Sequence, residues 1–474
     1  MSWLDATLKK SQHLLERGLD RNVRLAVTGL SGAGKTGFIT SLINQLLTAP
    51  TYHQLTFFKP NADGRLTASK LAQHPELHIP GFDYHGAIDR LTGNNPVWPA
   101  STRGVSQAQI KCRFHVSNKW VKKVQADSTV TIDIIDYPGE WLLDLPLLGM
   151  SFKEWCQACV KYLSSERREA FCSRIKSEIT ALDVTQAVDE TSTSNQLGVV
   201  AKKYTEALLK YREQHNDFSL ALPGRFILPG EFEGAPTLEF FPILNEDILS
   251  LDWGTVPANS IIKVLEKRFN YYKNEVIRPF FDEYFSKVDR QIVLIDTCSV
   301  LESGYDSYID LKQTIEKLLD GYSYGRSNWL KRLFSPSIDK LLIATSKVDL
   351  VPPDQHAALE SFMQKMVAQA RNNVGYEGVD VETMAISAIS TSEPVITEHD
   401  GQKLHCVKGK DRGSGNSVIH YPGKVPETIL SRSQWNQLEI DFSPFDIPEL
   451  NADEPLPHIR MDKVLQYLIG DKFL

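Results

Sequence analysis

The sequence is short of the features that mark membrane, secreted and nucleic-acid-binding proteins. Its 474 residues include only six cysteines, too few for a disulfide framework in a chain of this length. No apolar run reaches the roughly 18 residues of a membrane-spanning helix, and the N-terminal stretch lacks the apolar core of a signal peptide. Lys and Arg total 52 against 59 for Asp and Glu, and a net charge of −7 gives no general attraction to nucleic acid. We therefore expect a cytoplasmic protein without a nucleic-acid partner.

The composition is otherwise that of an ordinary globular protein, with 42% hydrophobic and 23% charged residues. At about 100–200 residues per domain, the length predicts two or three domains. One CxxC pair, Cys156 and Cys159, lies in a helical pattern. Because no second CxxC or HxxxH follows it, we expect no zinc site.

The N-terminal stretch has an amphipathic pattern, with apolar side chains at Trp3, Leu4, Leu8, Leu14 and Leu15. Such a pattern fits either a helix on a membrane surface or a helix packed on the protein. We expect the second, so membrane association is open but not expected.

Strands and helices alternate in two separated parts of the chain. Short apolar runs open or fill the segments 22–47, 128–139, 291–300 and 337–350. Long helical patterns at 151–183, 196–215 and 259–288 separate the second run from the third. The fold class is therefore predicted as α/β, a mainly parallel sheet covered on both faces and interrupted by a large helical insertion domain. The predicted divisions are an N-terminal helix at 1–20, the first half of the α/β domain at 21–149, the helical insertion at 150–288, the second half at 289–400 and an appended C-terminal segment at 401–474.

Residues 29–36, GLSGAGKT, match GxxxxGK[ST] between a predicted strand and a predicted helix. Glycines let backbone N–H groups point inward at a helix N-terminus, where the dipole is also positive, and this creates an anion site that fits a triphosphate. Lys35 would add charge near the β- and γ-phosphates and take part in catalysis, and the Thr36 hydroxyl would ligate Mg²⁺. A purely structural turn is the alternative, disfavoured by the rarity of the full pattern. The predicted phosphate contacts are Gly29, Ser31, Gly32, Ala33, Gly34, Lys35 and Thr36.

A second pattern, DYPG at residues 136–139, ends an apolar strand. Asp136 beside a phosphate loop can hold Mg²⁺, often through water, and Gly139 can offer its N–H to a γ-phosphate. A strand capped by a turn is the alternative interpretation. The phosphate loop upstream favours the metal-binding role.

A third pattern, SKVD at residues 346–349, follows the strand LLIAT, at the sheet edge where a base would be read. The Asp349 carboxylate can accept hydrogen bonds from N1–H and N2–H of guanine, whereas adenine would leave it unpaired. Lys347 would lay its aliphatic stem along the base. A surface turn explains the same residues, so this pattern alone does not decide between the two.

In this order, GLSGAGKT, DYPG, SKVD and the later Ser387–Ala388 of MAISAIS resemble the phosphate, switch II, base-recognition and second base-contact motifs of Ras-like GTPases. Because a large helical insertion interrupts them, the organisation is similar to the YcjX-like family of bacterial P-loop proteins, a stress-associated group linked with the phage-shock response. The resemblance covers most of the chain. It implies a P-loop NTPase (Ras-like) fold, GTP or GDP as ligand, Mg²⁺ as cofactor, and base contacts at Ser346, Ser387 and Ala388.

The resemblance also implies a switch I threonine that completes the Mg²⁺ shell of Thr36 and Asp136. Thr102 is the candidate, with Ser101 and Ser106 as competitors. Arg103 beside it is a candidate internal arginine finger, as in heterotrimeric G protein α subunits, and a surface arginine is the alternative.

Two positions depart from the Ras-like pattern. Ser346 stands where Asn or Thr is usual, which weakens the expected preference for guanine. Glu140 stands where Ras-like enzymes carry the glutamine that orients the attacking water, so it is a candidate catalytic residue and hydrolysis is expected to be slow.

The expected function is that of a GTP-binding switch with slow GTPase activity in a bacterial stress response. An unidentified protein partner is expected to bind through the helical insertion. Two alternatives stay open. One is an ATP-binding NTPase or kinase, which would need an acceptor pocket, and the other is a partner-binding protein whose nucleotide site is structural.

Overall fold

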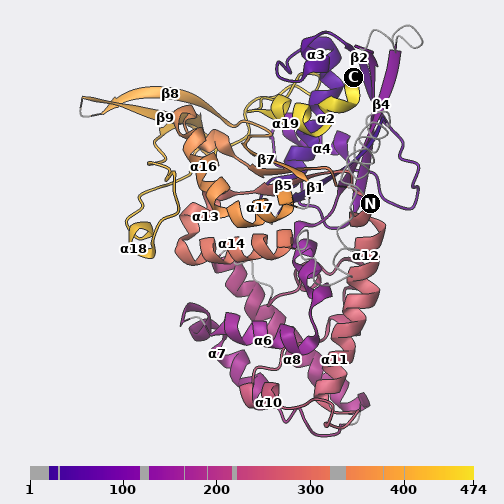
Figure 1. Ribbon diagram of the computed structural model, residues 1–474. Coiled ribbons are helices and arrows are strands. Elements are labelled where there is room, and N and C mark those ends of the chain that lie inside the picture. Colours follow the sequence, from indigo (N-terminus) through magenta and orange to yellow (C-terminus); the bar gives the residue numbers. More distant parts are fainter. Residues whose placement is uncertain are drawn as a thin grey trace, which may run out of the picture.

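The computed structural model describes residues 21–29, 32–117, 127–164, 166–188, 190–215, 221–320, 338–376, 378–399 and 401–474. The expected helix at 1–20 and the phosphate contact Ser31 lie outside these residues. In Figure 1 an α/β body occupies the upper part of the molecule, and the helices that follow β4 extend below it.

The α/β body is built on a seven-stranded sheet in the order β2-β3-β4-β1-β5-β6-β7 among the described residues. From β4 to β7 every neighbouring pair is parallel, whereas β2 pairs with β3 and β3 with β4 in antiparallel register. This mostly parallel sheet is the one expected of a P-loop NTPase. Its strands are β1 Asn22–Gly29, β2 Leu66–Ala72, β3 Ser106–His115, β4 Asp127–Asp136, β5 Arg290–Ile295, β6 Lys340–Thr345 and β7 Asp380–Ala385.

Both faces of the sheet are buried, as the central strand β6 shows. Leu342 and Ala344 belong to the hydrophobic core beneath α2, and the alternate residues Leu341 and Ile343 belong to the core beneath α16. Successive strand side chains point to opposite faces, so a strand covered on both sides is a continuous apolar run. The helices on the two faces are α2 Lys35–Tyr52, α3 Lys59–Ala62, α4 Tyr84–Thr92, α13 Thr297–Ser303, α14 Tyr305–Asp320, α16 His356–Met366, α17 Ala368–Tyr376 and α19 Met461–Ile469.

The helical insertion lies between β4 and β5 in the chain and has a core of its own. Trp155 stacks on Phe269, and Phe152 and Phe240 pack around that pair with ring centroids 5.3–5.9 Å apart. None of the described helices is both long and apolar enough to cross a membrane. The elements are the 3-10 helix η1 Gly139–Gly149, α6 Phe152–Leu163, α7 Glu166–Thr180, α8 Glu190–His215, α9 Gly224–Ile227, α10 Glu246–Ser250, α11 Ile261–Tyr271, the π-helix η4 Tyr272–Ile277 and α12 Arg278–Glu283.

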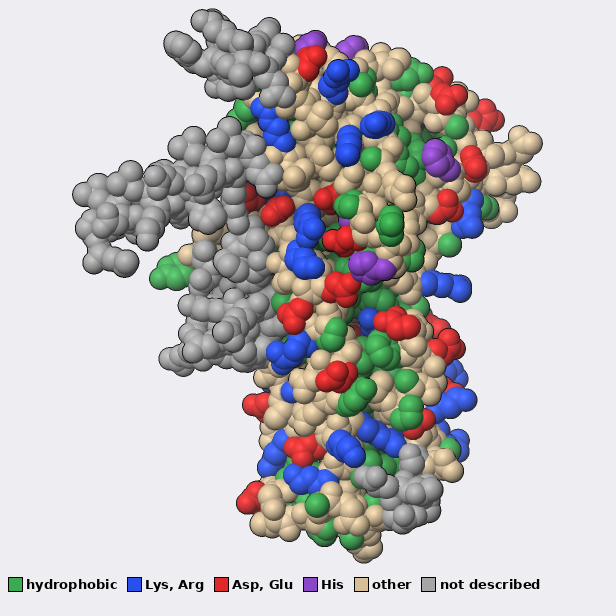
Figure 2. All heavy atoms as spheres, turned by 90° about the vertical axis from the view of Figure 1, so that its right-hand side faces the viewer, with side chains coloured by type: hydrophobic (Ala, Val, Ile, Leu, Met, Phe, Trp, Pro, Cys, Tyr) green, Lys and Arg blue, Asp and Glu red, His purple; other side chains and the backbone are tan. Residues whose placement is uncertain are grey.

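The surface of the molecule carries charges of both signs. On the face shown in Figure 2, Lys and Arg side chains lie among Asp and Glu side chains on both the α/β body and the helical insertion. This mixture agrees with the small net charge of −7.

The segment expected at 401–474 as an appended lobe divides between two places. Its first part joins β8 Ser392–His399 in a three-stranded antiparallel sheet that projects from the body in Figure 1. Its last helix, α19, lies in the same hydrophobic core as α2 and β1. The remaining elements are β9 Gln402–Lys410, β10 Ser417–His420, α18 Arg432–Trp435 and the 3-10 helix η8 Gly470–Phe473.

The end of the chain is held by apolar and charged contacts. The Phe473 ring lies against Phe58 and Phe114, with centroids 5.3 and 5.1 Å away. The buried guanidinium of Arg290, on β5, pairs with Asp471 at 2.8 Å. The C-terminal residues are therefore part of the α/β core, next to strands made from distant parts of the sequence.

Candidate functional site

The turn between β1 and α2 has the backbone of an anion site. Gly32 and Gly34 adopt left-handed conformations, with φ of 80° and 82°, which cost a glycine little and other residues more. The 18-residue helix α2 begins at Lys35, directly after this turn. Its first N–H groups have no intrahelical partner, so they and the helix dipole favour a bound phosphate.

Gly139, after β4, is pressed against this turn. A side chain at Gly139 would collide with the carbonyl oxygen of Gly29, and its Cβ would lie 3.4 Å from Lys35 Nζ. Only glycine allows this approach. It brings the backbone of the DYPG motif beside the lysine of the phosphate turn.

Three oxygen-bearing side chains from separate segments meet next to α2. Thr102 Oγ1 donates to Asp136 Oδ2 at 2.7 Å and lies 3.4 Å from Thr36 Oγ1. Thr36 comes from the first turn of α2, Asp136 from the end of β4, and Thr102 from the loop before β3. The structure thus brings together the three residues expected to bind a metal.

The Asp136 carboxyl is buried and has one oxygen available to bind a cation. It is 2% exposed, and Oδ1 has no hydrogen-bond partner among the described residues. Burial raises its pKa to about 6, although Thr102, Lys35 and Ser106 each lower it in part. A buried carboxylate oxygen flanked by two hydroxyl oxygens is the hard donor set that Mg²⁺ prefers, so these residues fit the metal that a Ras-like site requires.

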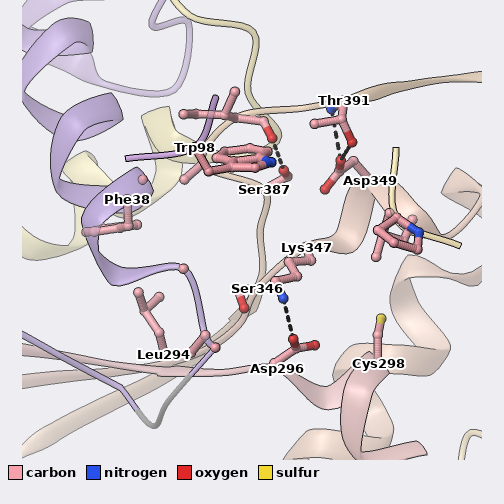
Figure 3. A pocket seen from close by; sticks show the side chains of 18 of the residues that line it. Phe38, Trp98, Leu294, Asp296, Cys298, Ser346, Lys347, Asp349, Ser387 and Thr391 are labelled. Carbon is pink, nitrogen blue, oxygen red and sulfur yellow. Dashed lines mark hydrogen bonds and ion pairs between the residues drawn. The ribbon is translucent and has the colours of Figure 1, made fainter. Parts of the chain in front are cut away.

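A pocket of about 510 Å³ connects the phosphate turn with the carboxyl ends of β5, β6 and β7 (Figure 3). Gly29, Asp136 and Gly139 are not among its lining residues. Eleven of the residues predicted to contact nucleotide or metal do line it, and these are Gly32, Ala33, Gly34, Lys35, Thr36, Thr102, Ser346, Lys347, Asp349, Ser387 and Ala388. Three of the four motifs, spread over more than 350 residues, therefore share one cavity, whereas the DYPG motif lies beside the phosphate turn without lining it.

Asp349 is oriented at the end of this pocket. Its Oδ2 accepts hydrogen bonds from the backbone N–H of Thr391 at 2.9 Å and from the Thr391 hydroxyl at 2.8 Å. The residue is 5% exposed. Thr391 thus fixes one oxygen of the carboxylate, which faces the pocket with its position already set (Figure 3).

Lys347 is also held in place. Its φ is 58°, and its Nζ pairs with Asp296 Oδ2 at 2.6 Å (Figure 3). Asp296 directly follows β5 and caps α13 by accepting the N–H of Ser299 at 3.0 Å. The lysine stem is consequently laid across the floor of the pocket between β5 and β6.

Ser346 and Ser387 are fixed mainly through their backbones. The Ser346 N–H donates to the carbonyl of Ile295 at 2.9 Å. Ser387 and Ile459 exchange two backbone hydrogen bonds of 3.1 and 2.8 Å, which ties the loop after β7 to the segment before α19. The C-terminal segment therefore supports this side of the pocket.

The two remaining candidate catalytic residues do not line the pocket. The Glu140 carboxylate is buried, and Oε1 lies 3.7 Å from the Arg212 guanidinium on α8. Arg103 is exposed beside Thr102. Glu140 in this arrangement faces the helical insertion.

Several pocket residues lay outside the sequence motifs. Trp98 comes from the same loop as Thr102, and Arg412, Phe442 and Phe445 come from the C-terminal segment. A Cβ at Gly37, on α2, would touch the Trp98 ring at 3.8 Å. No local pattern marks these residues. The acidic end of the strand QIVLID was the one available signal, for Asp296.

Comparisons with known proteins agree with this geometry. The model of the YcjX-like family, DUF463, matches residues 23–473. A protein of Shewanella oneidensis described as "Ras-like GTPase YcjX" is 37% identical over 492 residues, which covers all of both chains. A protein of Escherichia coli strain K12 with the same description is 36% identical over 465 residues, 97% of each chain.

Proposed function

Because the chain belongs to the YcjX-like family, we propose that it binds GTP with Mg²⁺ and hydrolyses it slowly, as a nucleotide-dependent switch. The convergence of Thr36, Thr102 and Asp136 beside a helix N-terminus carries this proposal, because Thr36 and Thr102 line the same pocket as Asp349. The names of the relatives, both Ras-like GTPases, point the same way. A role in a bacterial stress response is the part of the proposal that rests on the family resemblance alone.

The residues have distinct roles in this proposal. The N–H groups at the start of α2 and the Lys35 ammonium bind the phosphates, and Asp349 accepts from the edge of guanine. Thr36, Thr102 and the Asp136 carboxylate would hold Mg²⁺, which when bound neutralises charge on the β- and γ-phosphates. Gly139 offers its N–H on the γ-phosphate side. Glu140 and Arg103 stay candidates for orienting water and neutralising charge.

Slow hydrolysis follows from the position of Glu140. Its carboxylate pairs with Arg212 and would have to leave this contact to reach an attacking water. A carboxylate near the γ-phosphate is also repelled by it. Turnover should then depend on a movement of the segment after Gly139 or on a partner that binds the helical insertion.

Calorimetric titration with Mg–GTP and Mg–ATP tests the proposal directly. We expect tight binding of GTP, weaker binding of ATP, and loss of GTP affinity when EDTA removes Mg²⁺. Lys35→Ala should weaken GTP binding at least about tenfold, since a charge-assisted contact to phosphate is worth about 1.5–3 kcal/mol.

Lys70→Ala, at an exposed lysine on β2, is the matched control and should bind as wild type does. Unchanged affinity in Lys35→Ala would reject the phosphate assignment. Tighter binding of ATP than of GTP would support the ATP-binding alternative. If neither nucleotide binds, the proposed nucleotide-binding function is wrong.

A further inference from the structure

The start of η1 packs closely between the phosphate turn and the helical insertion. On one side, Gly139 has no room for a side chain against the carbonyl oxygen of Gly29. On the other side, Gly224, the first residue of α9, has no room for a side chain against the carbonyl oxygen of Glu140. Backbone therefore touches backbone on both sides, and residues 139–140 have little freedom to move independently of either neighbour.

Hydrogen bonds of Asp144 connect η1 to α9 of the helical insertion. Its Oδ1 accepts the N–H of Gly224 at 2.7 Å and its Oδ2 accepts the N–H of Arg225 at 3.2 Å. The Tyr272 hydroxyl, on the π-helix η4, forms a third hydrogen bond with the carboxyl group. The carboxyl is 2% exposed, so these bonds are shielded from water and their loss would leave buried donors unpaired.

Trp141 and Arg225 add further contacts between η1 and the α9 region. Trp141 Nε1 donates to the carbonyl of Leu228 at 2.9 Å, just after α9. The guanidinium of Arg225 lies over the Trp141 ring, 3.2 Å from its centroid. If η1 moves, α9 must therefore move with it, or the buried contacts of Asp144, Trp141 and Arg225 must all break together.

We propose that Asp144 is a positioning residue that holds Gly139 against the phosphate turn and makes the helical insertion respond to the nucleotide bound there. This inference rests on the proposed nucleotide-binding function. A γ-phosphate meets the Gly139 N–H, whereas a diphosphate ends short of it. By holding Gly139 in place, Asp144 therefore raises the affinity for the triphosphate more than the affinity for the diphosphate. By linkage, bound triphosphate strengthens the contact between η1 and α9.

The selective effect can be measured as a ratio of affinities. Asp144→Asn keeps the shape of the side chain but turns one acceptor into a donor that faces backbone N–H groups. We expect the ratio of GMP-PNP affinity to GDP affinity to fall by about fivefold or more, the scale of a typical coupling between sites. Asp252→Asn, in an exposed turn of the insertion where Oδ1 accepts the Gly254 N–H, should leave the ratio within about twofold of wild type.

Hydrogen exchange of residues 224–228 provides the second readout. In wild type, these amides should be better protected with GMP-PNP than with GDP, and Asp144→Asn should abolish the difference. A merely structural role would raise exchange equally in both nucleotide states. If Asp144→Asn does not fold, Tyr272→Phe, which removes only the hydroxyl, should lower the affinity ratio in the same direction.

The outcomes separate this inference from the proposed function. Wild-type affinity ratios and wild-type exchange differences in folded Asp144→Asn and in Tyr272→Phe would overturn the role of Asp144 while nucleotide binding stands. Equal protection of residues 224–228 with GMP-PNP and GDP in wild type would overturn the coupling. Failure of wild type to bind either nucleotide would overturn both.

Discussion

Among single residues, Asp349 is the one whose geometry most directly sets base preference. Thr391 holds its Oδ2 through two hydrogen bonds, so the other face of the carboxylate is presented to the pocket in a fixed orientation. We expect Asp349→Asn to weaken GTP binding about tenfold or more and to narrow the gap between GTP and ATP, because an amide offers one acceptor where guanine presents two donors. Calorimetry with both nucleotides measures this. An unaltered GTP-to-ATP affinity ratio would mean that the base is read elsewhere.

Asp354→Asn is the matched control for this measurement. Its half-exposed carboxylate lies near His405 at 3.2 Å and does not line the pocket. The GTP-to-ATP ratio of this variant should equal that of wild type.

Glu140 and Arg103 should affect turnover more than binding. Groups that orient water or neutralise charge act as the γ-phosphoryl departs, so their loss lowers the rate of the chemical step. We expect Glu140→Ala and Arg103→Ala to slow single-turnover GTP hydrolysis by about tenfold or more while GMP-PNP affinity changes by less than about threefold. Arg90→Ala, at an exposed arginine of α4, serves as control. Hydrolysis at the wild-type rate in both variants would remove these residues from the catalytic machinery.

The residues of the site that could be predicted are those carried by continuous motifs. Lys35, Thr36 and Asp349 lie in short patterns whose chemistry is readable from residue type and spacing. Thr391 could not be predicted, because its contact with Asp349 depends on how the loop after β7 folds back. Trp98 was missed for the same reason, since it enters the pocket from a loop without a motif.

At the scale of elements, η1 should show a pH dependence. Burial raises the Asp144 pKa to about 7, although the Tyr272 hydroxyl, the N–H groups of Gly224 and Arg225 and the Arg225 charge lower it in part. A carboxyl whose pKa is higher in the folded protein than the ordinary 3.8 contributes stability below about pH 4 and loses that contribution as the pH rises through about 7.

Thermal unfolding at several pH values tests this dependence. Between about pH 5.5 and about pH 8, the melting temperature of wild type should fall more than that of Asp144→Asn, whose side chain does not titrate. Both proteins are measured without nucleotide, so that linkage to phosphate binding does not enter. Parallel curves for the two proteins would show that the Asp144 carboxyl titrates outside this range.

Elements with a strong local period were predictable, and elements defined by pairing were not. The apolar run of β6 and the glycine turn before α2 carry their own signals, since each depends on neighbours in sequence. In the outer strand β2, six of seven residues are partly buried or exposed, so apolar alternation is weak and the strand forms by pairing with β3. The projecting strands β8, β9 and β10 have no such local signal and were not predicted from the sequence.

At the scale of the whole molecule, the core of the α/β body depends on its last residues. Phe473 is fully buried against Phe58 and Phe114. Phe473→Ala should lower the free energy of unfolding of the α/β body by about 3–5 kcal/mol, the usual cost of emptying a buried aromatic site. Urea denaturation gives the value. Leu474→Ala, whose side chain is 63% exposed, should change it by no more than about 0.5 kcal/mol.

If the C-terminal residues lay on the surface, Phe473→Ala and Leu474→Ala would both change the free energy of unfolding only slightly. A loss below about 1 kcal/mol in Phe473→Ala would therefore contradict the packing of α19 and η8 on the sheet.

The placement of β1 beside β5 has a consequence for how the protein is made. The Arg24 N–H donates to Asp289, 265 residues later in the chain. Ribosomes release β1 and α2 long before β5, β6, β7 and α19, so the parallel sheet cannot close during most of translation. The insertion between β4 and β5 is continuous in sequence and has its own aromatic core, so it can fold first. A nascent chain should therefore carry a finished helical insertion and an unformed base pocket until residues near 473 emerge, and during that time nucleotide cannot stabilise it.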